Sequence, residues 1–240
     1  MNPEDFDEAK EVFISIKNSS RLAKSKIVVC PPNLYIKALA ELSKKTKKIA
    51  IGSQNVFFEQ KGAFTGETSP SMLKNLGVQY VIVGHSERRR MGESSEDVSK
   101  KVSASLSSGL SVILCIGESE RDKEGIYLQA LKDMLSTSLL GIGEKNISKL
   151  IIAYEPIWAI GEGHSAMTPH DIYQMAVFIK KELCSIFGEI IGKKIPILYG
   201  GSVDPDNAGT IVKEGGVDGL LVGRESLNPE SFGRIIKSIK

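Results

Sequence analysis

The feature that most constrains the fold of this chain is one pattern that repeats along its length. Each repeat has a short apolar run rich in β-branched residues, then a loop, then a stretch whose apolar residues have helical spacing. The apolar runs lie at 27–30, 49–53, 80–83, 111–116, 150–154, 195–199 and 219–222. Strands that alternate with helices predict βαβ units, a parallel sheet and right-handed connections.

The number of predicted strands is one short of a closed barrel. The helical stretches that follow the strands lie near 33–45, 70–76, 94–108, 120–138, 168–187, 205–214 and 226–239. A further helix precedes the first strand, with Asn2 as its cap and Pro3 at its first position. A (β/α)8 barrel closes with eight strands. The sequence therefore predicts such a barrel with its first strand missing, that is, seven parallel strands and about eight helices.

Composition and charge limit the class of protein. The chain has 240 residues, 41% of them hydrophobic, and no linker divides it, so a single domain over 1–240 is expected. The net charge is +2 and basic residues are scattered among acidic ones, which argues against nucleic-acid binding. The sequence has no apolar run near the ~18 residues of a membrane span, and no secretory signal. Cys30, Cys115 and Cys184 lie far apart, which indicates reduced thiols in a cytoplasmic protein and no metal site.

Polar and glycine-rich segments follow four of the predicted strands. These segments lie at 84–89, 155–163, 200–202 and 223–226. In parallel α/β folds the functional site lies at the carboxyl ends of the strands. We therefore expect these four loops to converge on one face of the sheet.

Glu155 and His85 are candidate catalytic residues because each follows an apolar strand. A carboxylate in that place is partly desolvated, which raises its pKa and suits a general base. Pro156 keeps Glu155 out of helical geometry. Two alternatives stand beside this interpretation: Glu155 as an ordinary acid at a strand end, and His85 as a structural histidine.

Four glycines in these loops suit an anion site. Gly161, Gly200, Gly201 and Gly223 allow backbone amides to approach an anion, and loops after the last strands of such a barrel bind phosphate. Glycine is also common in ordinary turns. The dinucleotide-binding fingerprint and the GxxxxGK[ST] loop are absent from the sequence.

Two longer segments have interpretations of their own. The segment 156–166 is a candidate lid that excludes water on closing, or alternatively a packed connector. Its residues are Pro156, Ile157, Trp158, Ala159, Ile160, Gly161, Glu162, Gly163, His164, Ser165 and Ala166. The stretch 55–70 is too long for an ordinary βα loop. Its Phe57, Phe58 and Phe64 suggest a protein interface, or alternatively a loop folded on its own surface.

These segments together resemble the triosephosphate isomerase family. The motifs that carry the resemblance are Gly84-His-Ser-Glu-Arg-Arg, Ala153-Tyr-Glu-Pro-Ile-Trp-Ala-Ile-Gly, Tyr199-Gly-Gly-Ser, Asn55-Val-Phe-Phe and Gly62-Ala-Phe-Thr-Gly-Glu. The resemblance extends from Met1 to about Leu227. It implies interconversion of dihydroxyacetone phosphate and glyceraldehyde 3-phosphate by proton transfer through an enediol(ate), without metal or cofactor.

The resemblance also implies the roles of individual residues. Glu155 is implied as the base that moves the proton, His85 as the neutral electrophile, and Glu87 as an acid beside a catalytic lysine. The pairing of a glutamate base with a neutral histidine is a known example of pKa tuning in this family, so these two roles come from the resemblance alone. The phosphate-binding amides match Gly161, Ser202 and Gly223. The homodimer loop matches Phe64, Thr65, Gly66 and Glu67, with Thr65 as the tip that enters a neighbouring subunit.

The chain departs from the family pattern at its start. The family begins with a strand that ends in an Asn-Trp-Lys-Met-Asn-like motif, and Met1-Asn2 match its last two residues. The strand, its asparagine and its catalytic lysine are absent here, which predicts little or no isomerase activity, unpaired edges and a weakened dimer. Smaller departures are His164-Ser165-Ala166 at the far lid hinge and Arg224 where a second glycine is frequent.

Two accounts of this start and two rival functions stay open. The natural protein is longer and this start is internal, or the product begins here and is impaired or repurposed. The rival functions are a non-catalytic phosphate-binding or interaction protein on the same scaffold, and another barrel enzyme with a phosphate site. An upstream coding sequence that ends in Asn-x-Lys decides between the two starts.

Overall fold

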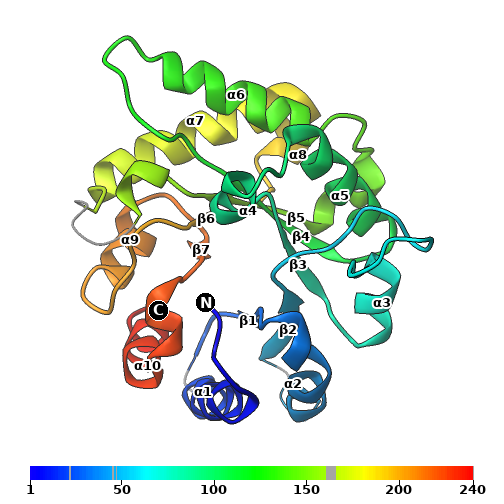
Figure 1. Cartoon of the computed structure of the whole chain (residues 1–240). Coiled ribbons are helices and arrows are strands. Elements are labelled where there is room, and N and C mark those ends of the chain that lie inside the picture. The colour runs from blue at the N-terminus through cyan, green and yellow to red at the C-terminus, as the bar shows by residue number, and fades with distance from the viewer. Residues whose placement is uncertain (22, 45, 47, 161–165, 240) are drawn as a thin grey trace.

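A computed structural model describes residues 1–21, 23–44, 46, 48–160 and 166–239. Seven parallel strands form one sheet in sequence order, from β1 to β7. The strands are β1 (Ile27–Val29), β2 (Ile49–Ser53), β3 (Tyr80–Val83), β4 (Ser111–Ile116), β5 (Leu150–Tyr154), β6 (Ile197–Tyr199) and β7 (Gly219–Leu220). The sheet curls, and the longer helices lie on its outer side, while the short helix α4 lies near the centre of the view (Figure 1).

Ten α-helices are assigned in the described part of the chain. They are α1 (Phe6–Ser19), α2 (Ile36–Ser43), α3 (Pro70–Asn75), α4 (Ser86–Arg90), α5 (Ser95–Ser107), α6 (Ile126–Ser138), α7 (Pro169–Phe187), α8 (Glu189–Gly192), α9 (Ala208–Glu214) and α10 (Pro229–Ser238). Short 3-10 turns are η1 (Asn33–Tyr35), η2 (Glu144–Lys149), η3 (Ile157–Ala159) and η4 (Arg224–Leu227). The fold class and the alternation of strands and helices are confirmed. The short helices α4 and α8 were not expected, because four or five residues carry little periodicity.

Several predicted helix starts were too early, including that of α9, which begins at Ala208 rather than at 205. Side-chain caps explain the starts of α1 and α6. Helix α1 begins at Phe6 rather than at Pro3, because the Asp5 carboxylate accepts the backbone N–H of Glu8 at 2.9 Å. Helix α6 begins at Ile126 rather than near residue 120, because the Asp122 carboxylate accepts the first helical N–H groups. A short polar side chain that reaches orphan amides therefore decides where each helix starts.

The hydrophobic core has two parts. The larger cluster fills the space between the sheet and the helices. The smaller cluster contains Ile82, Ile113, Cys115 and Ala153, and half-buried residues from other strands pack against it. Strands buried on both faces explain why their sequences read as continuous apolar runs. In the described residues no helix is long and apolar enough to cross a membrane, and no cluster of three potential metal ligands occurs.

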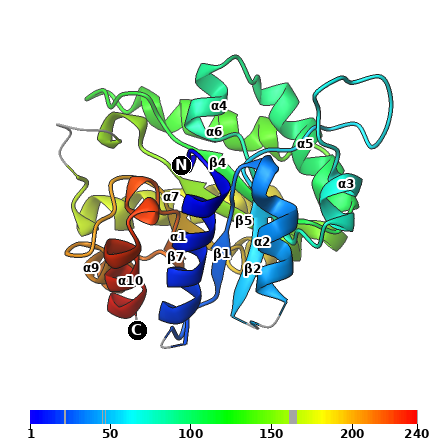
Figure 2. The same ribbon diagram turned by 60° about the horizontal axis from the view of Figure 1, so that its bottom comes forward.

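The sheet has two edges, β1 and β7, and no pairing joins them among the described residues. Helix α1 lies between α10 and α2 on the outer side of this opening (Figure 1). The Ile27 N–H donates to the carbonyl of Lys48, the residue before β2, so the backbone groups of Ile27 face β2. Because bonding direction alternates along a parallel strand, Val28 directs its backbone groups to the open side. The amide of Gln54 holds the Met1 carbonyl at 3.0 Å and the Cys30 carbonyl at 3.0 Å, and the N-terminus lies at the same end of the molecule as α4 (Figure 2).

Candidate active site

His85 and Glu155 meet at the carboxyl ends of the strands. His85 follows β3 and Glu155 follows β5, and the His85 Nε2 lies 3.1 Å from the Glu155 Oε1. The Glu155 side chain is 3% exposed and that of His85 is 31% exposed. The second carboxylate oxygen, Oε2, accepts the Ser86 N–H at 3.0 Å. The sequence prediction that these two residues converge is therefore matched by their geometry.

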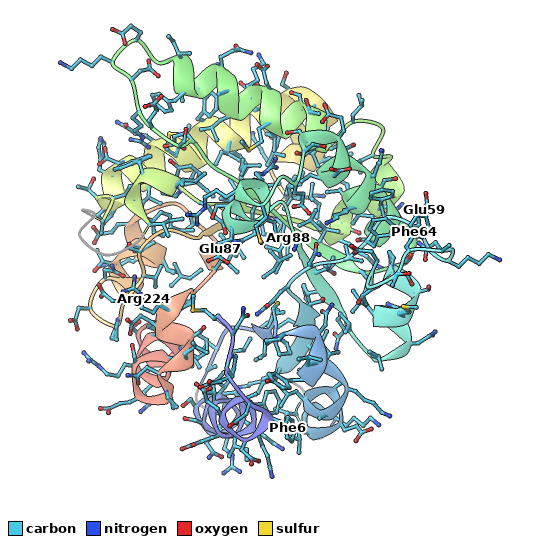
Figure 3. All side chains as sticks on the ribbon, viewed as in Figure 1. Phe6, Glu59, Phe64, Glu87, Arg88 and Arg224 are labelled. Atoms are coloured by element: carbon cyan, nitrogen blue, oxygen red, sulfur yellow. The ribbon has the colours of Figure 1, made fainter. Side chains whose placement is uncertain are left out.

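The surroundings of His85 define which ring nitrogen carries a proton. His85 caps helix α4, and its Nδ1 accepts the Glu87 N–H at 3.3 Å. A neutral imidazole that accepts at Nδ1 carries its proton on Nε2. The Nε2–H therefore points to the Glu155 carboxylate. The Glu87 carboxylate lies 3.9 Å from Nδ1, and Figure 3 shows Glu87 close to the centre of the ring of strands.

Burial raises the pKa of Glu155 above its ordinary value of 4.5. Three contacts oppose this effect because they favour the charged form: the His85 ring, the Ser86 N–H and the Cys115 thiol. Burial has the larger effect. A carboxylate with a raised pKa is a stronger base than one in water, so the site suits proton abstraction.

The raised pKa of Glu155 predicts a pH dependence of stability. The folded chain keeps the Glu155 proton at pH values where the unfolded chain loses it, so stability is lost as pH rises from 4.5 through the folded-state pKa. Glu155→Gln removes this titration. As pH rises from 4.5 to neutrality, we expect the free energy of unfolding of the variant to increase relative to that of the wild type. Urea unfolding across this range checks the prediction, and parallel pH profiles of the two proteins contradict it.

Two glycines make room for Glu155. A Cβ atom on Gly117, after β4, would lie 1.7 Å from the Glu155 carbonyl oxygen. A Cβ atom on Gly200, after β6, would lie 2.9 Å from the Glu155 Cγ. The main chain after β4 therefore packs directly against the Glu155 backbone, and the main chain after β6 packs against the Glu155 side chain. The single sequence showed Gly200 only as part of an anion loop and gave no role to Gly117.

Gly117→Ala is expected to destabilise the fold by about 3 kcal/mol, because the new methyl group overlaps backbone that cannot move without breaking the β4–β5 pairing. Urea unfolding measures the loss. Gly143→Ala is the matched control, because nothing lies within 4 Å of a Cβ atom there and its φ is −79°. Equal stabilities for the two variants contradict the enclosure of Glu155.

The loops after β6 and β7 lie side by side. Tyr199 pairs with Leu220, so Ser202 and Gly223 lie three residues beyond the same level of the sheet. Within the described part of the chain, nothing but the adjacent residues lies within 4 Å of a Cβ built on Gly223. The Ser202 hydroxyl donates to the Ala159 carbonyl at 2.8 Å, which connects this loop to the candidate lid. Gly161 lies outside the described residues.

The candidate lid is described only in part. Its positions 161–165 lie outside the described residues, and its first part forms the turn η3. The Trp158 indole N–H donates to the buried Glu118 carboxylate at 2.9 Å. Sequence reasoning missed Glu118, although it follows β4 as Glu155 follows β5 and carries the same positional signal.

A family comparison joins these observations to known proteins. The family model for triosephosphate isomerase matches residues 1–239.

The chain belongs to the triosephosphate isomerase family.

It is an intramolecular isomerase by family. The triosephosphate isomerase of Dictyoglomus thermophilum is 41% identical over 232 residues, which cover 95% of this chain and 92% of that protein. The triosephosphate isomerase of Caldanaerobacter subterraneus is 43% identical over 216 residues, which cover 89% of this chain and 86% of that protein. The triosephosphate isomerase of Carboxydothermus hydrogenoformans is 41% identical over 230 residues, covering 95% and 90%. The resemblance stated from the motifs is thus confirmed for the family.

Proposed function

We propose that this chain interconverts dihydroxyacetone phosphate and glyceraldehyde 3-phosphate with Glu155 as the base and His85 as the electrophile. The observation that carries the proposal is the 3.1 Å contact between a buried carboxylate and an imidazole whose Nε2 carries a proton. Family membership supports the choice of substrate.

The chemistry needs these two groups to separate from each other when substrate binds. The Glu155 carboxylate removes a proton from the carbon next to the carbonyl, and the electron pair of that C–H bond forms the C=C bond of an enediolate. The His85 Nε2–H turns from Glu155 to the carbonyl oxygen and stabilises its developing negative charge. The Nε2 proton passes to that oxygen, and the hydroxyl proton of the neighbouring carbon passes back to Nε2. Glu155 then returns its proton to the carbon that carried the carbonyl, and the new C=O bond forms on the neighbouring carbon. The raised pKa of Glu155 brings the carboxylate closer to the pH at which it both accepts and returns a proton.

The substrate phosphate is proposed to lie on the backbone amides of Gly161, Ser202 and Gly223, with Gly200 and Gly201 allowing the close approach. The shared level of the loops after β6 and β7 supports this placement. The bond from Ser202 to Ala159 supports a role for 156–166 as the lid over that phosphate. Glu87 lies beside His85 and is proposed to tune its surroundings.

We propose that turnover by the 240-residue chain is slow. Among the described residues, no lysine forms a hydrogen bond or ion pair with His85, Glu87 or Glu155. A missing preorganised donor of this kind costs about 10²–10³ in rate. Proton NMR of dihydroxyacetone phosphate in D₂O tests both parts of the proposal. Slow, enzyme-dependent exchange of the carbon-bound proton is expected. Binding of inorganic phosphate without exchange favours a non-catalytic phosphate-binding protein, and near-normal turnover contradicts the slow rate.

The loop before α3 is proposed to form a homodimer contact through Phe64, Thr65, Gly66 and Glu67. Phe57 stacks on Phe58 with ring centroids 4.3 Å apart and lies 4.8 Å from Phe64. Phe57 and Phe58 are half-buried by this packing, whereas Phe64 remains 43% exposed. In Figure 3, Phe64 lies at the outer side of the molecule beside α3. The three rings support a rigid tip that a second copy can receive.

Thr65→Asp is expected to raise the dimer dissociation constant at least about tenfold, because an unpaired charge buried at an interface costs about 2–5 kcal/mol. Light scattering over a dilution series measures the association. Lys61→Asp changes an exposed residue of the same loop outside the tip and serves as the control. A wild-type chain that is monomeric at every concentration contradicts the dimer contact.

A further inference from the structure

Arg121 holds an unusual position in the loop between β4 and α6. Its Nε donates to the Glu118 Oε1 at 3.0 Å, and its Nη2 donates to the Tyr154 hydroxyl at 3.1 Å. The same Nη2 lies 4.0 Å from the Met167 sulfur. Glu118, Tyr154 and Met167 are all buried. One guanidinium therefore contacts three separate segments of the chain.

The flat face of this guanidinium is also in contact with aromatic rings. The Arg121 Cζ lies 5.0 Å from the centre of the Trp158 ring and 5.3 Å from that of the Tyr127 ring. Distances below about 6 Å are those of cation–π contacts, which strengthen when the groups are partly desolvated. The Arg121 side chain is 24% exposed. Water therefore screens its ion pair with Glu118 less than it screens a pair on an exposed surface.

The residues that Arg121 contacts lie on both sides of Glu155. Tyr154 directly precedes Glu155, Trp158 follows it by three positions, and Met167 lies beyond the candidate lid. The Glu118 Oε1 accepts from Tyr154, Trp158 and Arg121 at 2.8, 2.9 and 3.0 Å. The other oxygen, Glu118 Oε2, is buried without a partner in the described structure. A carboxylate in that state needs an adjacent cation to offset its desolvation, and Arg121 supplies it.

We propose that Arg121 is a positioning residue that clamps both ends of the segment from Tyr154 to Met167 and so fixes the place of Glu155 and the Trp158–Ala159 turn. This inference rests on the proposed function, because that function makes Glu155 the base. The Ala159 carbonyl accepts from the Ser202 hydroxyl at 2.8 Å, so the clamp extends to the proposed phosphate loop. Lysine cannot replace the fork and the flat face of arginine together.

Trp158 is the only tryptophan of the chain, so its fluorescence reports the clamp directly. Three variants of the full chain are compared: Arg121→Gln, Arg121→Lys and Lys123→Gln. The last removes the same charge from an exposed side chain in the same loop and is the control. Acrylamide quenching of Trp158 and its response to inorganic phosphate are measured, with circular dichroism to confirm the fold. If Arg121→Gln does not fold, Arg121→Lys decides.

Arg121→Gln is expected to make Trp158 about twofold more accessible to acrylamide and to weaken phosphate binding about tenfold, which corresponds to about 1.4 kcal/mol. Arg121→Lys is expected to recover part of the phosphate affinity but not the protection of the indole. Quenching and affinity equal to those of Lys123→Gln overturn the clamp. A wild-type chain with no phosphate response overturns the proposed phosphate site instead, and the quenching comparison alone then decides the clamp.

Discussion

Replacing Glu155 with glutamine is expected to lower kcat/KM for dihydroxyacetone phosphate by about 10²–10⁴-fold, because a positioned general base contributes that much to proton transfer. Glutamine has almost the same shape as glutamate but cannot accept the proton. The measurement is exchange of the carbon-bound proton in D₂O at high enzyme concentration. Glu155→Asp keeps the charge but withdraws it by one methylene group. We still expect kcat/KM of Glu155→Asp to fall about 10²-fold, because misplacing a catalytic group by about 1 Å can lower the rate by that factor.

The control for this series is a buried glutamate away from the site. Glu182 on α7 is 7% exposed and pairs with Lys132 at 3.6 Å. Glu182→Gln alters a buried carboxylate without approaching His85 and is expected to retain the wild-type exchange rate. If Glu155→Gln and Glu182→Gln exchange the proton equally fast, Glu155 is not the base.

Adding a strand before Met1 is expected to raise turnover by about 10²–10³-fold and Tm by about 5–10 °C. The added segment is an apolar strand of about six residues that ends in Asn-x-Lys. The contacts of Gln54 hold Met1 next to the end of β1, so the strand is placed to pair with the open side of β1 and with β7. The gain in stability comes from pairing two free edges, and the gain in rate comes from a cation near Glu87 and Glu155.

A second extension, with methionine in place of the lysine, separates the gain in Tm from the gain in turnover. That version should raise Tm as much as the first but leave turnover close to the wild type. Amide hydrogen exchange at Val28 reports directly whether the strand pairs, because its N–H faces the open edge. An extension that changes neither exchange at Val28 nor Tm contradicts the idea that the opening accepts a strand.

Much of the fold was predictable because its signals are local. The strands at 49–53, 80–83 and 150–154 match the predicted bounds, because buried parallel strands are continuous apolar runs. The strand predicted at 195–199 begins at Ile197. Pro196 has no N–H for the ladder, although its carbonyl accepts from Ile152. The strand predicted at 219–222 ends at Leu220.

The site was predictable where residues follow strands, and not where contacts join distant segments. His85 and Glu155 each carry the signal of a polar residue after an apolar run, and their side chains meet. Arg121 carries no such signal, because its contacts come from Tyr154, Trp158 and Met167 and exist only in the fold. The enclosure of Glu155 by Gly117 is hidden for the same reason.

That enclosure has a consequence for how such a chain tolerates change. The main chain at Gly117 and Gly200 packs directly against Glu155, so this part of its surroundings has a fixed size, and the side chains that hold Glu155 all come from the strand ends and the loops after them. Residues on the outward faces of the helices are therefore free to drift during evolution, or to be redesigned for solubility, while the reacting carboxyl group stays where it is. Random mutagenesis should accordingly find active variants with many exchanges on α6 and α7 and none at Gly117.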